Sequence, residues 1–112
     1  MSGSTAGITQ ADFRKLFDSN DEFVLLDVRR SPAYQADTVV IPGATWHDPD
    51  AIATSAGTIP KNAPVIAYCV HGHEVSQDVA EYLQSQGYDA RYLEGGIDAW
   101  RAPAGPTAPK PD

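Results

Sequence analysis

Three short predicted strands alternate along this chain with segments whose apolar residues recur at helical spacing. They cover residues 23–26, 65–68 and 90–93, and the continuous apolar character of the first two is typical of strands buried on both faces. Between the second and third strands, Val75, Val79 and Leu83 recur at i, i+4 and i+8, which predicts a helix that ends before Gly87. Buried strands alternating with helices predict an α/β fold around a mainly parallel sheet.

Weaker patterns predict the remaining elements. Residues 9–12 resemble a capping box with Asp12 in place of the usual Glu, so we expect a helix from there to about Ser19. Residues 39–41 predict a short extended piece that a turn closes, and residues 50–53 a short helix. A last short helix with Ile97 and Trp100 on its buried side should follow the glycine pair at 95–96.

The length of 112 residues fits one domain. We expect a flexible N-terminus over residues 1–7, a folded domain over 8–102 and a flexible tail over 103–112, because that last stretch is rich in Pro, Ala and Gly. The first residues lack the basic and apolar parts of a secretion signal, and no apolar stretch is long enough to span a bilayer. These features predict a cytoplasmic protein.

The charge balance limits the classes of partner. The formal net charge is -7, and the eight basic residues are scattered, with no cluster longer than a pair. Binding to nucleic acid or to an anionic membrane needs a basic face, so we expect neither as a partner. Any attraction for an anionic substrate must be local.

Cys69 is the only cysteine and the main candidate for chemistry. It ends the apolar run 65–68 and opens a loop that contains Gly72 and leads into the predicted helix. Backbone N–H groups and the positive end of a helix dipole favour an anion at such a loop, and these surroundings make a thiolate a competent nucleophile. The alternative is a small buried apolar side chain. A single cysteine excludes an internal disulfide.

A set of short motifs, in order and spacing, resembles the single-domain rhodanese family. The resemblance runs from about Ile8 to Trp100, and its motifs are Asp27-Val28-Arg29, Tyr34, Ile41-Pro42-Gly43-Ala44, Cys69-x-x-Gly72, Leu83, Gly87-Tyr88 and Leu93-Glu94-Gly95-Gly96-Ile97-x-Ala99-Trp100. The resemblance implies a three-layer sandwich with a five-stranded, mainly parallel sheet. It also implies a sulfurtransferase, which takes a sulfane sulfur from a donor such as thiosulfate, holds it as a persulfide and passes it to a thiol, cyanide or a sulfur-relay protein.

The resemblance also assigns roles to residues. Cys69 is the catalytic residue, and Asp27 and Arg29 brace neighbouring loops without touching substrate. Neither a cofactor nor a metal is implied. The loop that follows the cysteine forms the substrate site, and its residues are Val70, His71, Gly72, His73, Glu74 and Val75.

This loop departs from the family pattern. Val70 and Glu74 stand where active rhodaneses commonly carry basic residues, and Val75 stands at the place of a small hydroxyl residue. A carboxylate near the sulfur opposes both the thiolate and a dianionic donor such as thiosulfate. Alternatively, Glu74 stabilises the start of the helix through the helix dipole. His71 and His73 partly replace the missing charge, because imidazole can become cationic below neutral pH.

Three other interpretations compete with the sulfurtransferase. A metal site at Cys69, His71 and His73 lacks an identifiable fourth ligand. A cysteine-dependent phosphatase needs an Arg six positions after the cysteine, where this chain has Val75. A non-catalytic rhodanese-like module that binds a partner or carries sulfur is the remaining alternative, which the acidic loop favours and the presence of Cys69 opposes.

Overall fold

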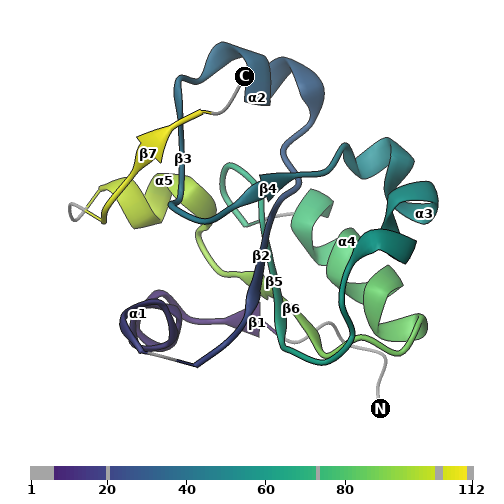
Figure 1. Ribbon diagram of the computed structural model, residues 1–112. Coiled ribbons are helices and arrows are strands. Elements are labelled where there is room, and N and C mark those ends of the chain that lie inside the picture. The colour runs from purple at the N-terminus through teal and green to yellow at the C-terminus, as the bar shows by residue number, and fades with distance from the viewer. Residues whose placement is uncertain (1–6, 20, 73, 103–104, 111–112) are drawn as a thin grey trace.

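A five-stranded parallel sheet forms the centre of the computed structural model, which describes residues 7–19, 21–72, 74–102 and 105–110 (Figure 1). The strand order is β1-β6-β5-β2-β4, and every pairing between neighbours is parallel. The strands are β1 (Gly7–Ile8), β2 (Val24–Asp27), β4 (Thr45–Trp46), β5 (Val65–Tyr68) and β6 (Ala90–Leu93). The prediction of an α/β fold with a five-stranded parallel sheet is therefore confirmed.

Helices cover both faces of this sheet and complete the three layers (Figure 1). In chain order the helices are α1 (Gln10–Asp18), α2 (Ser31–Ala36), α3 (Ile52–Ser55), α4 (Glu74–Ser85) and α5 (Gly96–Arg101), with 3₁₀ turns at Pro49–Ala51 and Ala56–Thr58. Of these, α2 lies beyond the end of the sheet at the top of Figure 1. The capping pattern at residue 9 behaves as predicted, since the Thr9 side chain accepts a hydrogen bond from the Asp12 N–H. None of the helices in the described ranges is long and apolar enough to cross a membrane.

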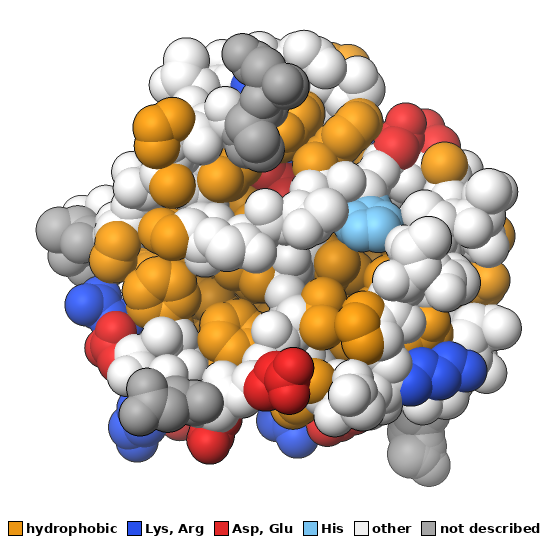
Figure 2. Space-filling model, viewed as in Figure 1, with side chains coloured by type: hydrophobic (Ala, Val, Ile, Leu, Met, Phe, Trp, Pro, Cys, Tyr) orange, Lys and Arg blue, Asp and Glu red, His pale blue; other side chains and the backbone are white. Residues whose placement is uncertain are grey.

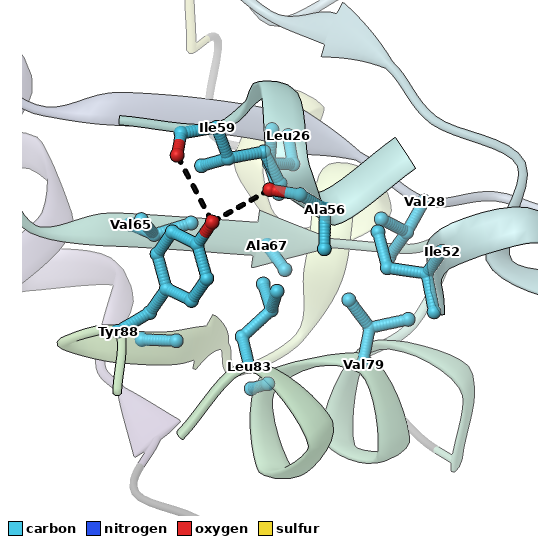
Figure 3. Close-up of a cluster of buried hydrophobic side chains, with 12 residues drawn as sticks. Leu26, Val28, Ile52, Ala56, Ile59, Val65, Ala67, Val79, Leu83 and Tyr88 are labelled. Carbon is cyan, nitrogen blue, oxygen red and sulfur yellow. Dashed lines mark hydrogen bonds between the residues drawn. The ribbon is translucent and has the colours of Figure 1, made fainter. Parts of the chain in front are cut away.

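Successive residues of the central strands point into two separate hydrophobic clusters, as alternation along a strand requires. Leu26 and Ala67 belong to the cluster under α3 and α4, where the Tyr88 hydroxyl also lies 2.6 Å from the Ala56 carbonyl oxygen (Figure 3). Leu25 and Ile66 belong to the other cluster, beside α1 and α5. The continuous apolar runs are thus explained by burial on both faces.

The cluster beside α1 is not completely covered. Leu16, Phe17, Phe23 and Ala44 are only partly buried against it. Figure 2 shows hydrophobic side chains reaching the surface over a broad area of the face seen in Figure 1, with acidic and basic side chains mainly around its edge.

The C-terminal segment corrects the prediction of a tail that contributes nothing to the fold. Within residues 105–110, β7 (Ala108–Pro109) pairs antiparallel with β3 (Val39–Val40). The Trp100 indole N–H donates to the Pro106 carbonyl at 2.6 Å, and the Lys110 ammonium donates to the Tyr34 carbonyl at 3.1 Å. These contacts use backbone groups and single side chains, so they leave no apolar periodicity in the sequence. The predicted tail residues 103–104 and 111–112, and the predicted flexible residues 1–6, lie outside the described part.

Candidate active site

Cys69 lies directly after β5, at the carboxyl edge of the sheet and between the neighbouring strands β2 and β6. Ligand sites of open α/β sheets form at this edge. The side chain is 6% exposed and borders a pocket of about 300 Å³. The pocket is lined by Arg29, Arg30, Ala33, Cys69, Val70, His71, Glu74 and Val75. The structure therefore brings the predicted cysteine and four residues of the predicted loop to one cavity.

The sulfur has a hydroxyl partner that the sequence analysis missed. The Cys69 thiol donates a hydrogen bond to Ser76 Oγ at 3.2 Å, and Ser76 is fully buried in the first turn of α4. A serine hydroxyl can accept from a thiol and, after ionisation, donate to the thiolate. The signal in the sequence was a polar residue on the apolar side of the predicted helix, one position beyond the expected hydroxyl at Val75.

Replacing Ser76 with alanine should slow alkylation of Cys69 by iodoacetamide at neutral pH by about three- to tenfold. Loss of one hydrogen bond costs about 0.5–1.5 kcal/mol, and here the loss falls mainly on the charged thiolate. Ser85→Ala is the matched control, because Ser85 lies exposed at the far end of α4. Equal alkylation rates in the native protein and the Ser76 variant would mean that the hydroxyl only fills space.

Glycine at position 72 allows the cysteine loop to pack against the start of α5. Gly72 has φ of +72°, and a Cβ there would lie 2.6 Å from the Gly95 nitrogen. The Ile97 N–H donates to the Cys69 carbonyl at 3.0 Å, and the Asp98 N–H donates to the Val70 carbonyl at 3.0 Å. The first turn of α5 therefore fixes the backbone that carries the cysteine.

Arg29, which lines the pocket on the side of β2, belongs to a buried network of ion pairs. The Arg29 guanidinium is 1% exposed, donates to Asp27 Oδ2 at 2.6 Å and Asp37 Oδ2 at 2.8 Å, and also bonds the Val39 carbonyl. Burial alone would lower the pKa of Arg29, but its hydrogen bonds with Asp27 and the nearby negative charge raise it above the ordinary value. The arrangement joins β2 to β3, and Arg29 also borders the pocket. The bracing role of Asp27 and Arg29 stays a prediction.

Tyr68 completes this network from β5. Its hydroxyl donates to Asp27 Oδ2 at 3.1 Å and accepts from the Ile41 N–H at 3.1 Å. Burial and the charge of Asp27 raise the pKa of the Tyr68 phenol, so that it remains a neutral donor. The strand that ends at the cysteine is thereby tied to the same ionic group as α2 and β3.

The rim of the pocket carries the charged residues of the loop. His71 Nδ1 lies 3.2 Å from Asp98 Oδ2, and both side chains are about half exposed. Glu74 begins α4 and is exposed, which suits its predicted alternative role at a helix start. His73 lies outside the described residues. Among the residues that the structure describes, no three His, Cys, Asp or Glu side chains are grouped so that they could hold a metal ion.

Comparison with known proteins defines the class to which this fold and site belong. The family model for the rhodanese-like domain matches residues 9–103, so the chain belongs to the rhodanese-like family. The relatives include the thiosulfate sulfurtransferase GlpE of Pseudomonas fluorescens (strain SBW25), 40% identical over 70% of both chains. The GlpE of Tolumonas auensis is 37% identical over 69% of this chain and 71% of its own length. The family resemblance stated from the motifs is confirmed.

Solved structures agree with this assignment. A rhodanese-like domain protein from Staphylococcus aureus superposes with a TM-score of 0.79 at 26% identity, covering 95% of this chain and 99% of its own. A rhodanese-related protein from Thermoplasma volcanium gives the same TM-score at 20% identity, covering 92% and 97% of the two chains, and supports the fold alone.

Proposed function

We propose that this protein is a sulfurtransferase that carries a sulfane sulfur on Cys69. The observation that carries the proposal is the position of the thiol in the lining of a pocket, with a buried hydroxyl 3.2 Å from its sulfur. Relatives named thiosulfate sulfurtransferase, at 40% and 37% identity, support the same chemistry. The donor is thiosulfate or a persulfide, and the acceptor is a thiol, cyanide or a sulfur-relay protein in the cytoplasm.

The reaction consists of two displacements at sulfur. The Cys69 thiolate attacks the outer sulfur of the donor, a new S–S bond forms, and the bond between that sulfur and the donor breaks. The leaving group, sulfite or a thiolate, departs with the electron pair. An acceptor thiolate or cyanide then attacks the outer sulfur of the Cys69 persulfide, and the Cys69 thiolate leaves with its electron pair. No external oxidant or reductant is needed.

The residues of the site support both anionic states of the cysteine. The Ser76 hydroxyl can donate to the thiolate and stay close when the sulfur chain lengthens. Val70 and Val75 border the pocket and keep part of its wall apolar, which limits hydration of the nucleophile. A phosphatase remains disfavoured because Val75 offers no guanidinium for phosphoryl oxygens.

A non-catalytic carrier or binding module is the second candidate, and the exposed carboxylate of Glu74 at the pocket favours it. Intact-mass measurement after incubation with an alkyl persulfide, and separately with thiosulfate, distinguishes the two. We expect one added sulfur atom per chain, its loss on addition of cyanide with formation of thiocyanate, and many turnovers per protein. The Cys69→Ser variant is the control. Loading without turnover would favour the carrier, and no loading by either donor would exclude the proposed chemistry.

A further inference from the structure

The positive charges around the Cys69 pocket are already paired with carboxylates. Arg29 bonds both Asp27 and Asp37, and Arg30 Nη1 lies 3.2 Å from Asp50 Oδ1. His71 Nδ1 lies 3.2 Å from Asp98 Oδ2, and Asp98 is also paired with Arg101. None of the salt bridges within the described ranges includes Glu74, although Glu74 borders the pocket. The pocket therefore offers a dianion little uncompensated positive charge.

A second hollow of about 180 Å³ adjoins the Cys69 pocket, since Arg30 and Val75 line both. Its remaining lining residues are Pro49, Asp50, Ile52, Asp78 and Val79. The two adjoining hollows, together called the groove here, lie beside the start of α4, with α2 and the segment 49–52 also in their lining.

The groove has an apolar interior and an acidic edge. Ala33, Val70, Val75 and Ile52 line its interior. Glu74 and Asp78 are both exposed and lie one helical turn apart on α4, so they occupy the same side of the helix. A ligand with a short aliphatic stem could place its sulfur at Cys69 and a positive group against these two carboxylates.

We propose that this groove selects a thiol or persulfide that carries a positive charge a few bonds from its sulfur. Glu74 and Asp78 are the specificity-determining residues, and they disfavour thiosulfate and other anionic donors. The inference rests on the proposed sulfur transfer at Cys69 and names the substrate class for that reaction. An opposite charge held near an exposed carboxylate strengthens binding, and a like charge weakens it by a similar amount.

Three small persulfides of similar length test this selectivity: those of cysteamine, N-acetylcysteamine and 3-mercaptopropionate, which are cationic, neutral and anionic. We expect kcat/KM for loading of Cys69 to fall by about three- to tenfold at each step from cation to anion at low salt. The steps should shrink at high salt. Thiosulfate should behave like the anionic persulfide. The tripeptides Lys-Cys-Lys and Glu-Cys-Glu can be compared as thiol acceptors of the Cys69 persulfide. A faster transfer to Lys-Cys-Lys would show that the preference for positive charge extends to peptides.

The variants Glu74→Gln and Asp78→Asn should each reduce the preference for the cationic donor, and the double variant should nearly abolish it. Glu22→Gln and Asp89→Asn are matched controls, since both residues are exposed and precede β2 and β6 at the opposite edge of the sheet. Equal rates for all three persulfides, or a preference for the anionic one, would overturn the proposed selectivity while leaving sulfur transfer intact. Failure of the neutral persulfide to load Cys69 would instead count against the sulfurtransferase itself.

Discussion

Replacing Arg29 with methionine should lower the free energy of unfolding by about 3–5 kcal/mol, measured by urea denaturation at pH 7. Arg29 is 1% exposed and Asp27 is fully buried, so the variant would leave the Asp27 carboxylate without its cation in the interior. Methionine keeps much of the apolar volume of the arginine stem, and the loss therefore reports on charge and hydrogen bonding more than on packing.

Arg30→Met is the matched control for this substitution. Arg30 is the next residue in the chain, and its pair with Asp50 is exposed, so we expect a change below about 1 kcal/mol. The double variant Asp27→Asn, Arg29→Met should recover part of the loss, because it removes the buried charge. A loss below about 1 kcal/mol in Arg29→Met would show that the network contributes no more than a surface pair.

Hydrophobic patterning predicts the parts of this fold that depend on burial. The strands at 65–68 and 90–93 and the helix through Val79 and Leu83 follow from their apolar positions, and the structure has all three. The location of Cys69 at the carboxyl edge of the sheet follows as well, because a buried strand ends at that residue. These elements lie in the centre of the molecule, where burial of apolar side chains dominates the energetics.

The missed elements depend on contacts that leave little trace in a pattern. β1 and β4 have two residues each, and their pairing is decided by the backbone of a neighbouring strand. α2 has six residues and buries only Tyr34, which is too few for a helical period. Ser76 occupies a core-facing position that periodicity assigns to an apolar residue. Its role depends on the hydrogen bond to the Cys69 sulfur, which the sequence pattern does not reveal. Spatial neighbours, and not local sequence, determine these features.

The contribution of the C-terminal segment is the other large expected effect. Ending the chain after Ala102 should lower the free energy of unfolding by about 2 kcal/mol, which is far more than the near-zero change expected for a flexible tail. The truncation removes the pairing of β7 with β3, the acceptor for the Trp100 indole and the contact of the Lys110 ammonium with the Tyr34 ring. Each lost hydrogen bond costs about 0.5–1.5 kcal/mol, partly offset by water and by the freed chain entropy.

Trp100 supplies a local measurement for the same truncation. Its side chain is 2% exposed, and Gly105 packs against the ring so closely that a Cβ there would lie 2.7 Å from a ring carbon. Removing the segment should expose the indole and shift its fluorescence to longer wavelength, whereas ending the chain after Lys110 keeps every described contact and serves as the control. If the shorter chain keeps both its stability and its emission maximum, the docked segment contributes nothing in solution. If it loses both, this Pro-rich stretch is part of the fold and supports the pocket wall, because Lys110 bonds the carbonyl of Tyr34 near the end of α2.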